Sequence, residues 1–386
     1  MKFLHPLMHN NFTKSDINAV IKVLKSDFLT QGQEVPAFEQ SICEYTNSQY
    51  AVAVNSATSA LHIACLALGL KQNDILWTSP ITFVASANCG LYCGASIDFI
   101  DIDPNSWNIS VEKLELKLKH AKLNNILPKI IVAVHLCGLS CDMKSINALS
   151  KKYGFKVIED ASHAIGGRFN NKKIGNCEYS DAAVFSFHAI KGITTGEGGM
   201  VVTNNHSLSE QLKLLRNHGI SRDENLMTHP ADGPWYYQQI TLGLNYRMTD
   251  IQGALGRNQL MRLDEFILKR HKIATIYNHE LSELPLKFQV HPEDSFSGMH
   301  LYVVRLNISK INRLKVFEFL RKEGIGANVH YIPVHLQPFY KQFGFKKGQF
   351  PEAEQYYNQA ISLPLYPDLR KHEINKVIKT LKDILL

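Results

Sequence analysis

A lysine stands where an apolar strand pattern meets a glycine-rich turn. Residues 185–191 read FSFHAIK and residues 194–199 read TTGEGG. Because burial disfavours the ammonium form, desolvation at this place would lower the pKa of Lys191 and make its amine a nucleophile toward a carbonyl. Most lysines are solvated surface residues, so Lys191 taken alone is weak evidence for a site.

A second apolar strand pattern ends in two carboxylates and a histidine. Residues 157–163 read VIEDASH and contain Glu159, Asp160 and His163. Consecutive side chains of an extended chain point to opposite faces, so only one of the two carboxylates can face a given ligand. That carboxylate needs a cationic partner, because burying it unpaired is costly. A helix cap that faces a loop is an equally good interpretation of these residues alone.

A third segment, residues 55–61 (NSATSAL), is a strand end that runs directly into a helix. Free backbone N–H groups and the hydroxyls of Thr58 and Ser59 would meet the positive end of the helix dipole, which favours an anion such as a phosphate. The alternative is that Ser56 or Thr58 only caps the helix.

The three segments together describe one ligand. All of them follow expected strands, and open parallel sheets bind ligands at the carboxyl ends of their strands. The ligand would have an anionic tail for the helix start, a ring cation for Asp160 and a carbonyl for Lys191, and pyridoxal phosphate has all three. The chain has no GxxxxGK[ST] motif and no GxGxxG after a strand, which counts against nucleotide hydrolysis and Rossmann-type hydride transfer.

The elements that must position these residues alternate along the chain. Apolar runs rich in β-branched residues predict strands, and helical patterns lie between most of the first four. This order predicts an α/β fold with a mostly parallel sheet covered on both sides. The expected strands are residues 50–54, 96–102, 129–134, 156–159, 182–187 and 199–203.

A helix is also expected ahead of the sheet. Ser15 can cap it, and Ile17, Val20, Ile21 and Leu24 follow helical spacing. Such an apolar face predicts packing on the sheet or on a partner.

We predict two domains, a large one over residues 1–247, with the N-terminal helix, and a smaller α+β one over residues 248–386. The polar stretch 222–234 predicts a loop, and a capping box at residues 249–252 predicts the start of a long helix. In the second domain, the expected strands are 300–308 and 327–331 and the expected helices are 312–322, 352–361 and 372–385.

Composition is that of an ordinary globular protein. The chain has 386 residues, a net charge of +7, 45% hydrophobic and 20% charged residues, which excludes disordered, fibrous and disulfide-stapled classes. So small a charge is compatible with nucleic acid, an anionic substrate or neither. The N-terminus lacks the apolar stretch of a signal peptide, and the longest apolar run, residues 130–139, is about half a membrane span. We expect a soluble cytoplasmic protein with no membrane partner.

Seven cysteines, an odd number, lie within the expected helices and strands, so we expect reduced thiols. The pairs Cys89/Cys93 and Cys137/Cys141, with His135 near the second, raise the question of a metal site. These residues have no CxxC or HxxxH spacing, so we expect buried structural cysteines and no metal.

Three longer stretches resemble the signatures of a known family. EDASHAIGG (159–167), SFHAIKGITTGEGG (186–199) and GLNYRMTDIQGALG (243–256) are similar to those of the PLP-dependent nucleotide-sugar aminotransferases, the DegT/StrS family. The similarity runs in order from about residue 13 to the C-terminus, which is more specific than any single motif. It implies the aspartate aminotransferase fold (fold type I of PLP enzymes) and a homodimer with shared active sites.

The resemblance also implies roles at the cofactor. Lys191 would carry the cofactor covalently and move the proton, and Asp160 would keep the pyridine nitrogen protonated. Phe83 would stack on the ring, with His163 on the other side or near the phenolic oxygen. The phosphate would be bound by the N–H of Ala57, by Thr58, Ser59 and Ser186, and by Asn245 of the second subunit.

Simpler interpretations exist for some of these residues. Phe83 could belong to the core, and Asn245 could be a turn residue. Arg247 could pair with a pyrophosphate or with Asp250, so it stays outside the predicted set. Relatives commonly have Gly where Ala57 stands, although one branch shares the Ala.

Within the family, five segments most resemble the branch that serves the pseudaminic-acid pathway. They are LTQG (29–32), NSATSALH (55–62), PWYYQQ (234–239), VHYIPVHLQPFY (329–340) and ISLPLYPDL (361–369). That branch aminates C4 of UDP-2-acetamido-2,6-dideoxy-β-L-arabino-hexos-4-ulose with L-glutamate as donor. The alternative is the same chemistry on another UDP- or dTDP-linked keto sugar, at C4 or C3. A branch that dehydrates sugars has histidine in place of the lysine, so Lys191 favours amination.

The resemblance implies contacts with the sugar nucleotide from Asp27, Phe28, Leu29, Thr30, His330 and Tyr331. Since His330 and Tyr331 alternate on the strand expected over residues 327–331, only one of them should face the site. Structural packing is an equal alternative for either. A rival class is a non-catalytic relative that binds DNA, but Lys191 and Asp160 are intact and the basic residues form no stripe, so we expect no nucleic acid.

Overall fold

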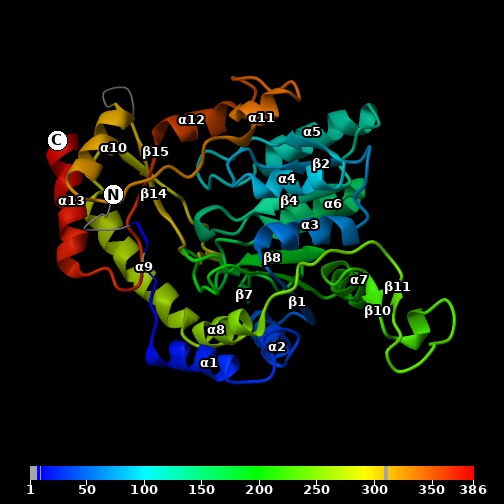
Figure 1. Cartoon of the computed structure of the whole chain (residues 1–386). Coiled ribbons are helices and arrows are strands. Elements are labelled where there is room, and N and C mark those ends of the chain that lie inside the picture. Colours follow the sequence, from blue (N-terminus) through cyan, green and yellow to red (C-terminus); the bar gives the residue numbers. More distant parts are fainter. Residues whose placement is uncertain (1–6, 9, 308–311) are drawn as a thin grey trace.

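The computed structural model describes residues 7–8, 10–307 and 312–386 (Figure 1). Several apolar clusters around one large sheet make up a larger centre, and a single cluster makes up a smaller one. The larger centre surrounds a seven-stranded sheet in the order β1, β9, β8, β5, β4, β2, β3. Strand β9 runs antiparallel to β1 and β8, and the other neighbours are parallel. The strands are Tyr50–Val54 (β1), Ile75–Thr78 (β2), Ser96–Phe99 (β3), Ile130–Val134 (β4), Lys156–Asp160 (β5), Ala182–Ser186 (β8) and Gly199–Thr203 (β9).

Helices cover both faces of this sheet, because its strands carry apolar residues on both sides. Helices α3, α4 and α7 pack on one face. On the opposite face, α5 and α6 cover one half, and α2 and α8 cover the other. Their bounds are Glu34–Thr46 (α2), Ala57–Ala67 (α3), Ala85–Tyr92 (α4), Val111–Leu123 (α5), Met143–Tyr153 (α6), His206–Arg216 (α7) and Asp250–Leu260 (α8).

The smaller centre lies between a three-stranded antiparallel sheet and three helices, on the left of Figure 1. Helix α9 links the two centres, since Leu263 and Ile267 pack below the large sheet whereas Ala274 and Tyr277 pack in the smaller core. The two-domain division at residue 247 stays a prediction. The elements are Leu286–Phe288 (β12), Tyr302–Leu306 (β14), Ala360–Leu363 (β15), Leu263–Glu280 (α9), Arg313–Lys322 (α10) and Lys371–Leu385 (α13).

Short elements complete the described chain. A loop between β10 and β11 projects from the large sheet at the lower right of Figure 1. Strand β6 pairs with both β7 and β13 in a small separate sheet. The bounds are Arg168–Phe169 (β6), Lys172–Lys173 (β7), Ile220–Ser221 (β10), Gln238–Gln239 (β11), Ser295–Phe296 (β13), Pro338–Lys341 (α11) and Pro351–Gln359 (α12), with 3₁₀ turns at Leu136–Gly138, Glu224–Leu226 and Val334–Leu336.

All six strands expected in the large sheet are present, with small shifts at their ends. Strand β2 is missing from the predicted set, because four residues are too short for a clear pattern. The strand expected over residues 327–331 is wrong, since Asn328 makes only an isolated bridge to Ser362. The helix expected over residues 352–361 is α12 followed by strand β15, and position 308, the expected end of β14, lies outside the described residues.

The N-terminal helix, α1 (Lys14–Leu24), is capped by Thr13 rather than by Ser15. Thr13 N donates to the Asp16 carboxylate at 2.7 Å, and the Ser15 hydroxyl donates instead to Asn258. The helix packs against α8. Its predicted apolar face does not pack on the sheet, since Ile17 and Leu24 are 54% and 56% exposed.

All seven cysteines have free thiols. Within the described ranges, no three metal-binding side chains cluster together, and no helix has the length and apolar character to span a membrane.

Candidate active site

A cavity of about 530 Å³ opens where β5 and β8 end, beside the first turn of α3. Its wall contains Ala57, Thr58, Asp160, Ser186 and Lys191. The three segments singled out in the sequence therefore meet, as predicted, because parallel strands end at one edge of the sheet.

Lys191 lies in the turn after β8, where its N–H donates to His188 O at 2.9 Å. Burial lowers the pKa of its amine to about 8, although the nearby negative charge of Asp160 acts in the opposite direction. This confirms the predicted effect of desolvation. About a tenth of such an amine is neutral at pH 7, far more than for a solvated lysine.

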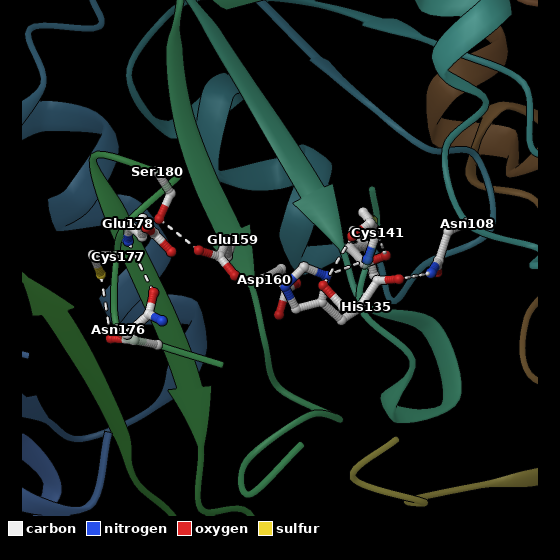
Figure 2. Close-up of polar contacts among 12 residues, drawn as sticks. Asn108, His135, Cys141, Glu159, Asp160, Asn176, Cys177, Glu178 and Ser180 are labelled. Carbon is white, nitrogen blue, oxygen red and sulfur yellow. Dashed lines mark hydrogen bonds and ion pairs between the residues drawn. The ribbon is translucent and has the colours of Figure 1, made fainter. Parts of the chain in front are cut away.

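Asp160 is the last residue of β5 and lies buried at the cavity wall. Its carboxylate accepts a 2.6 Å hydrogen bond from Ser86 Oγ and a 3.1 Å bond from Ser162 N. Glu159 points to the opposite face of the sheet, where it contacts His135 (Figure 2). Of the two carboxylates, only Asp160 therefore faces the cavity, as expected from the alternation of side chains along a strand.

The first turn of α3 leaves amides free toward the cavity. Ser56 is the N-cap, and its hydroxyl accepts from Ser59 N at 3.1 Å, so the capping alternative is correct for this residue. The Ser59 hydroxyl donates to Asn55 at 2.6 Å and is not part of the cavity wall. The N–H groups of Ala57 and Thr58 have no acceptor within the helix, because the first turn has none to offer.

An aromatic wall closes the other side of the cavity. Phe83 is 59% exposed and faces the cavity, so its interpretation as a core residue is wrong. Its ring centre lies 6.3 Å from that of Tyr331. Both His330 and Tyr331 line the cavity, which corrects the expectation that only one would. The reason is that this segment is not a strand and its side chains do not alternate.

His163 connects the two sides of the cavity. Its Nε2 lies 3.1 Å from the Tyr331 hydroxyl. Burial, and next the positive charge of Lys191, hold the pKa of His163 well below its usual value. The ring is therefore neutral, and it lies beside a second buried imidazole, His300, at 4.5 Å between ring centres.

Besides Ser59, five predicted residues lie outside the wall of this cavity within one chain. Residues 27–30 follow α1 and run to the start of α8, where Thr30 pairs with Thr249. Phe28 and Leu29 are exposed there. Asn245 pairs with Asn217, which also accepts a 2.7 Å hydrogen bond from Arg247. The ligand contacts of residues 27–30 and of Asn245 stay predictions.

Sequence reasoning did not find Ser86, the hydrogen-bond donor to Asp160. Ser86 lies three residues after Phe83, and the hydroxyl of Thr82, which precedes Phe83, lies 2.7 Å from Ser86 Oγ. Ser86 reaches Asp160 only because α4 lies beside the end of β5, and the two residues are 74 positions apart in the sequence. No local spacing reveals such a contact. His188, Glu197 and Asn328 line the cavity as well and had no predicted role.

The profile of the DegT/DnrJ/EryC1/StrS aminotransferase family matches residues 10–382. The chain belongs to this family. Its sequence is 39% identical over 384 residues to the UDP-4-amino-4,6-dideoxy-N-acetyl-β-L-altrosamine transaminase of Campylobacter jejuni, covering 98% of this chain and 96% of that protein. Helicobacter pylori PseC, an aminotransferase involved in the biosynthesis of pseudoaminic acid, superimposes with a TM-score of 0.89 at 34% identity, covering 100% of this chain and 99% of that one. The PLP-form of a putative sugar aminotransferase, Spr1654 of Streptococcus pneumoniae, gives 0.87 at 26% identity and covers 100% and 98%.

As a DegT/DnrJ/EryC1/StrS aminotransferase, the protein has fold type I and depends on pyridoxal phosphate. The cavity fits that cofactor, since it offers a lysine amine, a carboxylate and free helix amides. Position 199, at the start of β9, has no room for a side chain, because a Cβ there would lie 2.5 Å from Ala57 N. The absent side chain lets β9 approach the helix start closely.

Proposed function

We propose that this aminotransferase moves the amino group of L-glutamate to C4 of UDP-2-acetamido-2,6-dideoxy-β-L-arabino-hexos-4-ulose. The product would be UDP-4-amino-4,6-dideoxy-N-acetyl-β-L-altrosamine. The observation that carries the proposal is a cavity with Lys191 and Asp160 in a chain 39% identical, along nearly its whole length, to a transaminase of that name.

The inner side of the cavity would bind the cofactor and move protons. Bound pyridoxal phosphate supplies an electron sink and carries the amino group from one substrate to the other. The Lys191 amine, with its lowered pKa, can take a proton from the substrate carbon and return it. Asp160, held by Ser86, would keep the ring nitrogen protonated. The amides of Ala57 and Thr58 would hold the phosphate.

The outer side would contact the sugar nucleotide. Tyr331 and His330 face the cavity there, and Phe83 offers an exposed ring for stacking on the cofactor. Residues 27–30 would complete the substrate contacts. We further propose a homodimer in which Asn245 of the partner subunit reaches the phosphate. The exposure of Phe28 and Leu29 on one chain supports an assembly that covers them.

A substrate panel tests the proposed sugar. The purified enzyme, loaded with pyridoxal phosphate and supplied with L-glutamate, is offered UDP- and dTDP-linked 4-keto and 3-keto sugars. We expect a product from the UDP-linked 4-keto sugar, with NMR placing the new amine on C4. Turnover confined to a dTDP-linked sugar, or amination at C3, would contradict the proposal in favour of the related activity.

A mixing experiment tests the shared site. Lys191→Ala and Asn245→Ala chains are each expected to be nearly inactive, whereas heterodimers assembled from both have one site with neither substitution. Activity should therefore return on mixing. If none returns although sequential affinity purification through a different tag on each chain recovers heterodimers, the sites are not shared.

A further inference from the structure

A buried hydrogen-bonded pair lies directly behind Asp160, and no step above uses it. Glu159 Oε2 is 2.8 Å from His135 Nε2, and Glu159 Oε1 accepts a 2.6 Å hydrogen bond from Ser180 Oγ. Figure 2 shows Glu159 between Ser180 and His135. His135 is fully buried and Glu159 is nearly so. Burying a carboxylate is unfavourable unless hydrogen-bond donors satisfy its oxygens. Here each oxygen of Glu159 has a donor.

The proton on His135 has a defined place. Its Nδ1 accepts a 3.1 Å hydrogen bond from Cys141 N, so the ring proton is on Nε2 and is donated to Glu159. The main chain of the same histidine also donates, from His135 N to Asp160 O at 3.1 Å. One residue on the end of β4 therefore holds both residues at the end of β5, one through its ring and the other through its backbone.

We propose that Glu159 and His135 are positioning residues for Asp160. The side chains of consecutive strand residues point to opposite faces, so a turn of the end of β5 about its own axis would misdirect Asp160 and Glu159 together. Anchoring Glu159 on the far face, between β4 and Ser180, prevents that turn. The Asp160 carboxylate then stays aimed at the ring nitrogen of the cofactor, as outer hydrogen-bond partners orient the ligands of metal sites. This inference rests on the proposed role of Asp160, not on the identity of the sugar.

The chain contains a matched control for this pair. His335 Nε2 lies 3.0 Å from Glu354 Oε1, and the same oxygen accepts a 2.7 Å hydrogen bond from Gly348 N. Both residues are buried, and neither lines the cavity. Truncating Glu354 therefore removes a similar buried pair without touching Asp160.

The experiment compares Glu159→Ala, Glu159→Gln and Glu354→Ala. In equilibrium titrations of the apo-protein with pyridoxal phosphate, Glu159→Ala should weaken binding on the order of tenfold. Glu159→Gln should regain most of this loss, because its amide can accept from His135 and donate to Ser180. Hydrogen exchange of the apo-protein over residues 158–163 should be faster in Glu159→Ala. Glu354→Ala should lower only the melting temperature.

Each outcome decides the proposal. Equal cofactor affinity in Glu159→Ala and Glu354→Ala would overturn it, as would a Gln variant as weak as the Ala variant. If Glu159→Ala does not fold, Ser180→Ala takes its place, since it removes one of the two donors to Glu159. Unchanged affinity for pyridoxal phosphate and unchanged hydrogen exchange over residues 158–163 would then refute the proposal. The titration needs no sugar, so an enzyme that aminates a different sugar leaves the test intact.

Discussion

The inner and outer walls of the cavity are built in different ways. In the inner wall, Asp160 is the last residue of β5, the free amides of α3 come shortly after β1, and Lys191 lies in the turn that follows β8. The outer wall is formed by residues 328–331, which belong to no regular element.

This difference separates chemistry from substrate choice. Side chains fixed by a rigid sheet keep the short distances that proton transfer requires, and hydrogen bonds such as Ser86 to Asp160 fix them further. Rings on an irregular segment can be exchanged without disturbing that geometry. Substitutions in the inner wall should therefore damage both half-reactions, whereas those in the outer wall should affect the sugar alone.

Lys191→Ala is the strongest test of the inner wall. Without the amine, the cofactor has no covalent attachment and the substrate carbon has no adjacent base, so we expect turnover to fall by about 10⁴-fold. The absorbance of the attached cofactor and the glutamate half-reaction should be lost together. Lys172→Ala is the control, because that lysine is an exposed partner of Glu178. A Lys191→Ala enzyme with a tenth of wild-type activity would refute the assignment.

Asp160→Asn should have the next largest effect, a loss of roughly 10²-fold in both half-reactions. A neutral amide does not stabilise a proton on the ring nitrogen. Its NH₂ group also cannot accept the hydrogen bond that the Ser86 hydroxyl donates to Asp160. Stopped-flow rates with glutamate and with the keto sugar measure the two halves separately. Asp264→Asn, in the exposed cluster with Tyr45 and Lys173, serves as control. A loss confined to the sugar half would contradict the division between the walls.

The pH dependence of cofactor attachment should follow the lysine. The pKa of Lys191 is lowered from 10.5 to about 8, and only the neutral amine attacks a carbonyl. The rate at which apo-protein captures pyridoxal phosphate should therefore rise about tenfold per pH unit below 8 and level off above it. Asp160 raises the pKa, so Asp160→Asn should move the midpoint to lower pH. A midpoint near 10 in the wild type would show that the amine is solvated.

The sequence predicted the inner wall far better than the outer one, and the reason is physical. Lys191 and Asp160 stand at strand ends, which local apolar patterns reveal, and the order of the elements then brings these ends together. The 327–331 segment looks like a strand locally, but long-range bonds give it another shape. His330 Nδ1 lies 2.8 Å from Ser362 Oγ, and the Tyr356 hydroxyl donates to His330 O at 2.9 Å.

Tyr331→Phe should have the smallest effect and the most selective one. The substitution removes the hydroxyl that lies 3.1 Å from His163 Nε2. Among the described residues, the Nδ1 atom of that buried ring has no hydrogen-bond partner. One lost hydrogen bond is worth about 1 kcal/mol, so we expect kcat/KM for the keto sugar to fall about fivefold while the glutamate half-reaction stays within about twofold. Tyr340→Phe is the matched control, because its buried hydroxyl donates to Asn88 at 2.6 Å outside the cavity wall. Equal losses in both half-reactions would mean that Tyr331 acts on the cofactor through His163, and that the outer wall shares the chemistry of the inner one.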